Sequence, residues 1–240
     1  MIIIPDVHGR SFWKKPVEDN LGKEHIIFLG DYIDPYEYEG IAPWEALLQF
    51  EEIVELKKEN PDNITLLLGN HDIHYLTEMG RGQRFDCIRA DRIKSFIMEN
   101  ADLFQLMYTA ENKGKKFLYS HAGILSGWMC NNKKYLDNAT PDTIGGVLND
   151  MWADRSRWPV LFNILSDVPR SRWGDAFFGS PIWSDAEDMR IDDPELAGYY
   201  QVFGHTQQEY DPEINAYFAC LDCRRAFRLS EKDNTFTSIP

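Results

Sequence analysis

The sequence has few cysteines, too few to build the protein around disulfide bonds. Four cysteines in a chain of 240 residues, Cys87, Cys130, Cys220 and Cys223, are too scattered for a disulfide framework. Cys220 and Cys223 form a C-x-x-C pair, but no second pair of ligands is spaced to complete a zinc site with them. We therefore interpret these two as small buried residues.

Positive charge is also scarce. Lysine and arginine number 25 against 39 aspartate and glutamate residues, so the formal net charge is −14. Nucleic-acid backbones and anionic lipids are bound by positive side chains that neutralise phosphate. We therefore expect neither a long nucleic acid nor a membrane surface as a partner, whereas an acidic chain suits a protein that holds cations.

Long apolar runs are absent as well. No stretch approaches the roughly 20 consecutive apolar residues of a membrane-spanning helix. The first residues, MIIIPDVHG, have no basic region and reach an acidic residue after a short apolar run, so they do not have the pattern of a signal peptide. These features predict a cytoplasmic protein.

What the sequence does have is the composition of a globular domain. With 43% apolar and 27% charged residues, the chain can bury a sizeable core, and we expect one domain over residues 1–240. Residues 126–190 are rich in tryptophan and arginine, and their patterning is less regular than elsewhere.

Strand and helix patterns alternate along the chain. Continuous apolar runs at 1–4, 25–30 and 64–69 are typical of strands buried on both faces. Residues 43–61 have apolar side chains spaced by three and four, with a proline near each end, which predicts a helix and hence a βαβ unit. Further predictions are a helix at 86–100, a hairpin at 106–123 and strands at 199–204, 216–220 and 225–229. The pattern indicates an α/β fold.

Five apolar runs end in a small residue or proline and are then followed by side chains that can bind metal. These side chains are Asp6 and His8, Asp31 and Asp34, Asn70 and His71, His121, and His205. One such residue alone is most simply explained as turn chemistry. The loops beyond the carboxyl ends of strands gather in one crevice in open α/β sheets, so five together predict a shared metal site.

Carboxylate, imidazole and amide ligands suit hard to borderline divalent metals. We expect manganese first, with iron and zinc as alternatives. A carboxylate such as that of Asp31 can bridge two ions, and two ions about 3.5–4 Å apart would activate a bridging hydroxide for in-line attack on a phosphate ester. The pattern therefore predicts phosphoester hydrolysis.

The motifs in order, DVHG, GDYID, GNHD, SHAG and GHT, resemble those of the calcineurin-like metallophosphoesterases. They span residues 6–206 and are most similar to the branch that contains Ser/Thr phosphoprotein phosphatases and symmetrical diadenosine tetraphosphatases. The resemblance implies layered β-sheets flanked by helices, with the active site at the carboxyl ends of the strands.

The same resemblance implies a role for each motif residue. Asp6, His8 and Asp31 would hold the first metal, and Asp31 would bridge to a second. The other ligands of the second metal would be Asn70, His121 and His205. His71 would act as general acid or stabilise the leaving-group charge, with Asp34 orienting its imidazole.

The sequence departs from the phosphoprotein phosphatases at two positions. Pro35 and Leu68 stand where those relatives have arginines that bind the substrate phosphate. Arg10, Arg81 and Arg84 are the candidates to replace them. The Trp/Arg-rich segment at 126–190 has two interpretations: a cap that stacks a base and binds phosphates, or a tryptophan core with a solvated arginine rim.

We therefore predict a two-metal phosphoesterase acting on a small phosphorylated molecule or nucleotide. A Ser/Thr protein phosphatase acting on phosphoproteins is the first alternative, weakened by Pro35 and Leu68. A metal-binding scaffold without catalysis is the second, and the complete ligand set argues against it.

Overall fold

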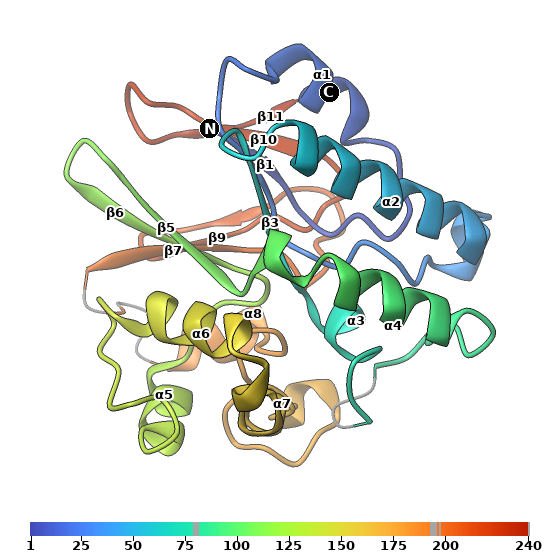
Figure 1. The fold of residues 1–240 in the computed structure, drawn as a ribbon. Helices are drawn as coiled ribbons and strands as arrows, with labels where there is room; N and C mark the ends of the chain where they lie inside the picture. Colours follow the sequence, from blue (N-terminus) through green and yellow to red (C-terminus); the bar gives the residue numbers. More distant parts are fainter. Residues whose placement is uncertain (79–81, 193–195, 197, 240) are drawn as a thin grey trace. The chain divides into compact units, whose positions relative to one another are not determined.

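The computed structural model describes residues 1–78, 82–192, 196 and 198–239. The chain forms two compact units, one of Met1–Phe104 with Arg224–Pro240 and the other of Gln105–Cys223. Each unit has its own mixed sheet with helices beside it (Figure 1). This confirms the predicted α/β class, with two sheets flanked by helices.

The sheet of the first unit has the strand order β11-β10-β1-β2-β3-β4. Its strands are β1 (Ile2–Ile4), β2 (Ile26–Phe28), β3 (Ile64–Leu67), β4 (Phe104–Gln105), β10 (Ala226–Leu229) and β11 (Phe236–Ile239). β1, β2 and β3 are parallel neighbours, and β10 runs antiparallel to β1. The carboxyl ends of the three parallel strands therefore meet at one edge.

Three helices follow these strands on the same side of the sheet, as Figure 1 shows. They are α1 (Lys14–Asn20), α2 (Pro43–Glu59) and α4 (Ala90–Glu99). The 3₁₀ turn η1 (Glu37–Glu39) precedes α2, the short α3 (Asn70–Ile73) precedes α4, and the 3₁₀ turn η2 (Ala101–Leu103) follows α4. Tyr32 stacks on Phe50 of α2 at 4.6 Å between ring centroids. This aromatic contact packs α2 against the loop that follows β2.

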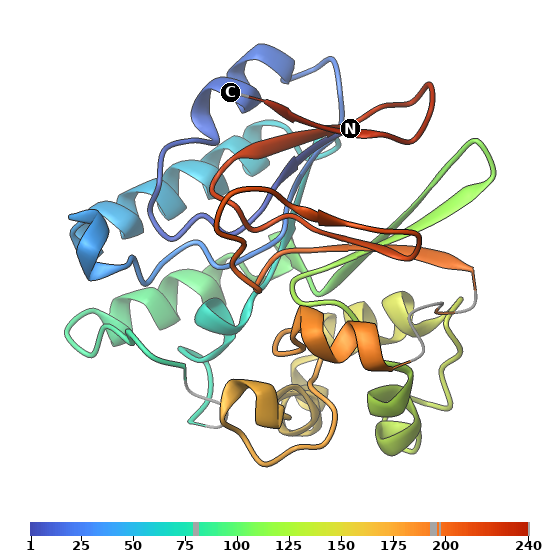
Figure 2. The same ribbon diagram turned by 180° about the vertical axis from the view of Figure 1, so that it is seen from behind.

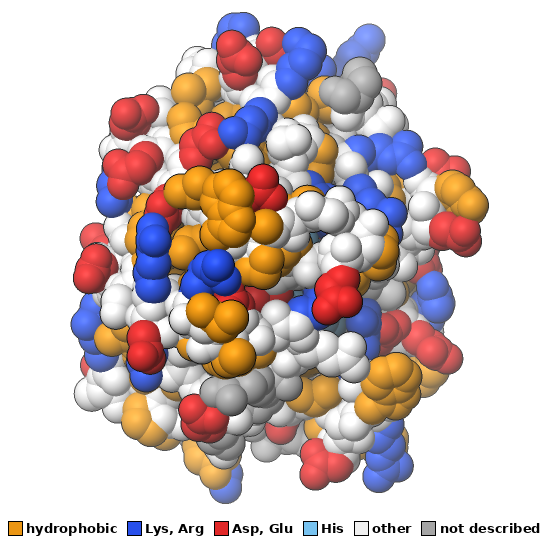
Figure 3. All heavy atoms as spheres, turned by 90° about the vertical axis from the view of Figure 1, so that its right-hand side faces the viewer, with side chains coloured by type: hydrophobic (Ala, Val, Ile, Leu, Met, Phe, Trp, Pro, Cys, Tyr) orange, Lys and Arg blue, Asp and Glu red, His pale blue; other side chains and the backbone are white. Residues whose placement is uncertain are grey.

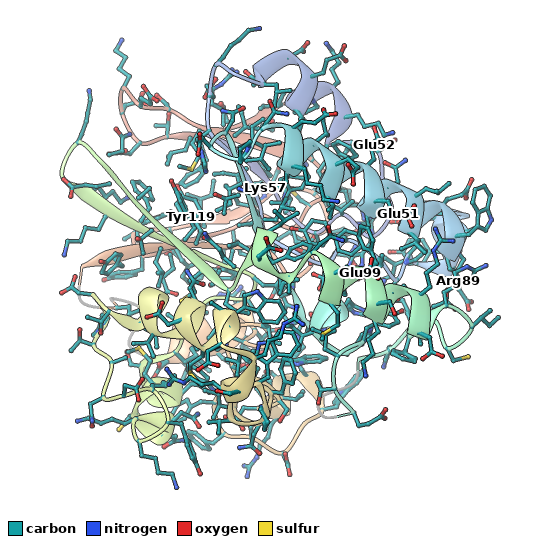
Figure 4. The ribbon with its side chains drawn as sticks, viewed as in Figure 1. Glu51, Glu52, Lys57, Arg89, Glu99 and Tyr119 are labelled. Atoms are coloured by element: carbon teal, nitrogen blue, oxygen red, sulfur yellow. The ribbon has the colours of Figure 1, made fainter. Side chains whose placement is uncertain are left out.

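The outer side of α2 carries charged side chains beside the half-exposed Trp44 and Leu48. Figure 4 shows Glu51, Glu52 and Lys57 along it, and Glu51 pairs with Arg92 of α4 at 2.6 Å. Figure 3 shows acidic and basic side chains interspersed over the face that it presents. Exposed ion pairs on such a surface contribute little to stability.

The second unit has the strand order β5-β6-β7-β9-β8. Its strands are β5 (Met107–Asn112), β6 (Lys115–Ser120), β7 (Tyr199–Phe203), β8 (Glu213–Ile214) and β9 (Phe218–Cys220). β5 and β6 form the predicted hairpin, and β6, β7 and β9 are parallel neighbours. In this unit, too, the carboxyl ends of adjacent parallel strands meet.

The Trp/Arg-rich segment is built mainly from short helices, which lie together beside the sheet of the second unit in Figures 1 and 2. They are α5 (Ser126–Asn132), α6 (Ile144–Ala153), α7 (Trp158–Leu165) and α8 (Ala186–Ile191), with turns η3 (Arg155–Arg157) and η4 (Arg170–Arg172). Trp128, Trp152 and Trp158 are buried, whereas Trp173 is exposed. No helix among the described residues is long and apolar enough to cross a membrane.

Candidate active site

The loops after β1, β2 and β3 are tied together by their backbones. The N–H groups of Val7 and His8 both donate to the carbonyl oxygen of Asp31, at 3.0 and 2.8 Å. Gly30 has a φ of +104°, and a Cβ there would lie 2.5 Å from the Gly69 nitrogen. Because only glycine fits so close an approach, the G of the GDYID motif lets the second and third loops touch.

Several predicted site residues have left-handed backbone conformations. The φ angles are 45° at His8, 53° at Asp31, 60° at Asp34 and 61° at His205. Non-glycine residues adopt such angles rarely, and they persist only where the surrounding structure enforces them. The surrounding structure therefore holds the backbone at these positions, and this fixes the direction of each side chain.

Asp6, His8 and Asp31 form the first cluster of potential metal ligands. One donor atom from each lies within 4.8 Å of the others, and all three side chains are buried. The Nδ1 of His8 is 2.8 Å from the carbonyl oxygen of Ile33, so Nδ1 carries the proton and Nε2 keeps its lone pair. Burial also lowers the pKa of His8, which favours the neutral form that binds metal.

The donor chemistry of this cluster fits a divalent cation. Buried carboxylates are costly unless a positive charge compensates them. The side chains of Asp6 and Asp31 are each only 1% exposed, and the neighbouring imidazole of His8 is neutral. Two carboxylate oxygens and one imidazole nitrogen are ligands that manganese, iron and zinc all bind.

Asp72 is a positioning residue that the sequence interpretation missed. Its carboxylate accepts hydrogen bonds from the backbone N–H groups of Gly69, Asp31 and Tyr32, at 2.8, 2.8 and 3.1 Å. Burial, and then the nearby charge of Asp31, raise the pKa of Asp72. Asp72 nevertheless joins the loop after β2 to the start of α3, so the D of GNHD fixes the frame on which the ligands sit.

Asn70 and His71 begin α3 directly after β3 and are both buried. The N–H of His71 donates to Oδ1 of Asp31 at 2.9 Å, which orients that carboxylate. The Nδ1 of His71 lies 2.8 Å from Oδ2 of Asp34. The structure thus brings His71 and Asp34 together in the predicted pair, with Nε2 of the imidazole facing away from Asp34.

Asp34 has two further partners. His74 Nε2 lies 2.7 Å from its Oδ2, and the Tyr75 hydroxyl donates to its Oδ1. Burial alone would raise the pKa of Asp34, but His71 and His74 outweigh it, so the pKa is lowered and the carboxylate stays ionised. Both His74 and Tyr75 lie in the string GNHDIHYL.

The segment after α3 places Arg84 next to His71. The N–H of Gly82 donates to Nδ1 of His74 at 3.1 Å, and the ring of Phe85 stacks on Tyr75 at 4.6 Å. Between these anchors, Arg84 Nη2 lies 3.0 Å from Nε2 of His71. The predicted arginine therefore lies at the nitrogen that would face a substrate, whereas Arg81 lies outside the described residues.

Arg10 lies on the other side of the first cluster. Its Nη1 donates to the carbonyl oxygen of Asp6 at 3.2 Å, and its Nε donates to Glu39 at 2.8 Å. The side chain is only 8% exposed, yet Nη2 has no hydrogen-bond partner among the described residues. Arg84 and Arg10 both lie over the ring of Tyr36, at 3.6 and 5.3 Å from its centroid.

In the second unit, the structure brings together the other two predicted histidines. His121 follows β6 and His205 follows β7, its parallel neighbour, and the Gly204 N–H donates to the His121 carbonyl oxygen at 2.8 Å. Nε2 of His121 lies 3.1 Å from Nδ1 of His205. Two imidazole nitrogens this close can bind one metal ion.

The Trp/Arg-rich segment supports His205 within the same unit. Arg172 donates from Nη2 to the His205 carbonyl oxygen at 3.3 Å and to Thr206 Oγ1 at 3.0 Å, and its Nε pairs with Asp185. Trp183 meets the His205 ring edge-on at 5.8 Å. The sequence indicated this segment only by its tryptophans and arginines, without showing which loop it contacts.

Comparison with known proteins agrees with this arrangement. A cold-active protein-tyrosine phosphatase of a psychrophile Shewanella species has 18% sequence identity and a TM-score of 0.52, over 100% of this chain and 80% of that one. A protein serine/threonine phosphatase from Saccharomyces cerevisiae has 16% identity and a TM-score of 0.50, over 92% of this chain and 65% of that one. At such identities these likenesses show the fold.

The family model of the calcineurin-like phosphoesterases matches residues 2–209, which include every motif described above. The chain therefore belongs to the calcineurin-like phosphoesterase family and is a metal-dependent phosphoester hydrolase.

Proposed function

We propose that the protein is a two-metal phosphoesterase acting on a small phosphorylated molecule or a nucleotide. The observation that carries the proposal is that the buried Asp6, His8 and Asp31 cluster lies directly beside the paired His71 and Asp34. Metal ligands and a candidate proton donor are thus built on adjacent strand ends. This combination is what hydrolysis of a phosphate ester requires.

The proposed first ion is held by Asp6, His8 and Asp31, and the second by Asp31, Asn70, His121 and His205. Family membership and the matching donor types support this second set. When bound, the two ions would supply Lewis acidity, activating water for in-line attack and neutralising charge on the phosphoryl oxygens. Manganese is the proposed ion, and the cytoplasm the proposed compartment.

In this proposal His71 acts on the leaving-group oxygen. Asp34 accepts from Nδ1, so a doubly protonated imidazole would present its Nε2 proton to the departing oxygen or stabilise its charge, with Arg84 turned from Nε2 toward the substrate phosphate. His74 and Tyr75 also contact the carboxylate of Asp34 and restrict its orientation. The carboxylate in turn restricts the orientation of the His71 imidazole. Asp34 is therefore a positioning residue, and its effect is transmitted through His71.

Arg10 and Arg84 are the proposed phosphate ligands. Pro35 and Leu68, where related phosphatases have arginines, are both buried and cannot bind an anion. Arg84 lies against Nε2 of His71, and Arg10 keeps a buried Nη2 donor without a partner among the described residues. Guanidinium groups bind phosphate oxygens through paired N–H donors, so both side chains can take over the lost function.

A phosphoprotein is the second candidate substrate. The two structural neighbours are named as protein phosphatases, and their likeness to this chain extends over most of its length. Loss of the two family arginines favours the small molecule instead. Retention of His71 with its partner Asp34 argues against a scaffold that binds metal without catalysis.

Hydrolysis by metal-stripped protein tests the proposal. Manganese, iron, zinc or magnesium would be added back, with p-nitrophenyl phosphate, its bis-ester, diadenosine tetraphosphate and a phosphopeptide as substrates. We expect turnover that requires metal, with a nucleotide preferred over the phosphopeptide. Preference for the phosphopeptide would identify a protein phosphatase, and two bound ions without any turnover would identify a scaffold.

A further inference from the structure

His74 and Tyr75, directly after α3, anchor the segment that carries Arg84. The Gly82 N–H donates to Nδ1 of His74 at 3.1 Å, and the Asp86 N–H donates to the Tyr75 hydroxyl at 2.9 Å. Arg84 lies between these anchors, in a left-handed backbone conformation with a φ of 65°. Such a conformation persists only where the surrounding structure enforces it, so the two anchors determine where the Arg84 side chain begins.

The same two side chains contact the carboxylate of Asp34. Nε2 of His74 lies 2.7 Å from Oδ2, and the Tyr75 hydroxyl donates to Oδ1. Nδ1 of His71 lies 2.8 Å from the same Oδ2. All four side chains are buried, with exposed fractions between 1% and 7%. His74 and Tyr75 therefore join two parts of the proposed site, the carboxylate that orients His71 and the segment that carries Arg84.

The hydrogen bond from Gly82 defines which nitrogen of His74 carries the proton. A backbone N–H can only donate, so Nδ1 is the acceptor and the proton of a neutral ring is on Nε2, toward Asp34. Burial lowers the pKa of His74, which favours this neutral form. Because the imidazole ring is rigid, it keeps a constant spacing between the carboxylate on one side and the backbone of residue 82 on the other.

We propose that His74 is a positioning residue that sets the spacing between Arg84 and the His71–Asp34 pair, with a separate effect from each ring nitrogen. Nε2 acts through Asp34 on His71, and thus on the leaving-group oxygen. Nδ1 acts through Gly82 on Arg84, and thus on the bound phosphate. The inference rests on the proposed function and deepens it, because in-line attack requires the phosphate and the group that acts on the leaving oxygen to be held in a fixed relation.

Two substitutions of His74 keep the contact of one nitrogen and remove that of the other. His74→Gln can place an amide N–H near the position of Nε2, facing Asp34, but it has no acceptor at the position of Nδ1. His74→Asn can place its amide oxygen near the position of Nδ1, where it accepts from Gly82, but it has no donor that reaches Asp34. Both variants are neutral at this position. His25→Gln is the control, because His25 lies at the amino end of β2 with Nε2 at 2.9 Å from Thr65.

The readouts are kcat and KM for an alkyl phosphate at saturating metal, with the inhibition constant of inorganic phosphate as a measure of phosphate binding. We expect His74→Asn to lower kcat about tenfold and to leave KM within about twofold, because only the orientation of His71 is relaxed. His74→Gln should raise KM and the inhibition constant about fivefold, with kcat within about twofold, because only the Arg84 segment is released. His25→Gln should change none of these values.

Double variants show whether the two effects pass through the residues named. His74→Gln should raise KM no further when it is combined with Arg84→Ala, and His74→Asn should lower kcat no further when it is combined with His71→Ala. Fully additive effects in both combinations would overturn the inference. So would equal changes of kcat and KM in the two single variants, because a histidine that only fills the core gives no such separation.

A protein that hydrolyses no phosphate ester would instead contradict the proposed function. The link from Nδ1 of His74 to Arg84 would then be tested by calorimetric binding of inorganic phosphate to the metal-loaded variants. We expect weaker binding in His74→Gln than in His74→Asn. Equal binding in the two variants would contradict the link.

Discussion

The strand ends of the two units differ in the charge of the potential metal ligands that follow them and in the backbone hydrogen bonds that hold these ligands. In the first unit, Asp6, His8 and Asp31 supply two carboxylates and an imidazole, and backbone bonds from Val7 and His8 to Asp31 hold them together. In the second unit, His121 and His205 supply two imidazoles, tied by one backbone bond at Gly204. The first set can compensate a divalent charge by itself, whereas the second brings no negative charge of its own.

Because of this difference, the two proposed ions need not bind with the same affinity. Carboxylates lower the energy of a bound cation through their charge, and a rigid frame reduces the entropy lost on binding. We therefore expect a tight first ion and a weaker second ion. Substitutions in each set of ligands separate the two ions.

Asp31→Asn should have the largest effect, because Asp31 is in the first set and is proposed to bridge both ions. We expect activity to fall on the order of a thousandfold, with less than one ion retained per chain. Turnover of p-nitrophenyl phosphate and metal content measured by atomic emission are the readouts. Asp91→Asn on the exposed side of α4 is the control, and an Asp31→Asn protein that keeps two ions would contradict the bridging role.

His71→Ala should lower kcat by roughly a hundredfold or more while both ions stay bound, because His71 is proposed to act on the leaving group. The loss should be smaller for p-nitrophenyl phosphate than for an alkyl phosphate, since a good leaving group needs less protonation. His25→Ala, at the amino end of β2 and away from the site, is the control. Equal losses for the two substrates would argue against a general acid.

His205→Ala should remove the weaker ion and keep the tight one. We expect one ion per chain and an activity loss of roughly ten- to a hundredfold at limiting metal, partly restored by excess metal. Titration of the metal-stripped variant with manganese measures the number of bound ions and the activity that excess metal restores. If both ions were lost together, the expected inequality of the two sites would be wrong.

Arg172→Gln should have the smallest effect, because Arg172 donates to the backbone carbonyl oxygen of His205 and to the hydroxyl of Thr206. We expect about a threefold weaker second ion, with substrate KM unchanged at saturating metal. Arg170→Gln, on the exposed start of the same η4 turn, is the control. A change in substrate KM at saturating metal would indicate instead that Arg172 contacts the substrate.

The sequence predicted the main strands and the residues that follow them, because both signals are local. The apolar runs became β1, β2, β3, β6 and β7, and the residues after them lie at the carboxyl ends as expected. The buried state of Cys220 and Cys223 was also predicted. The short α1 and the edge strand β11 were not, since their apolar residues are too few to give a clear period.

The supporting residues could not be found in the same way. Asp72 appeared as part of a motif, but its three backbone donors come from two loops that are distant in sequence. Arg84 and Arg172 are ordinary loop arginines until the fold places one beside His71 and the other behind His205. Such roles depend on long-range geometry, which composition and spacing do not encode.

Counting bound manganese while activity is recorded decides whether the phosphoesterase uses two metal ions. The stripped protein would be titrated with manganese, and the hydrolysis of p-nitrophenyl phosphate measured at each step. We expect one tight and one weaker ion per chain, with activity rising as the second ion binds. Full activity with a single ion, or without metal, would contradict it.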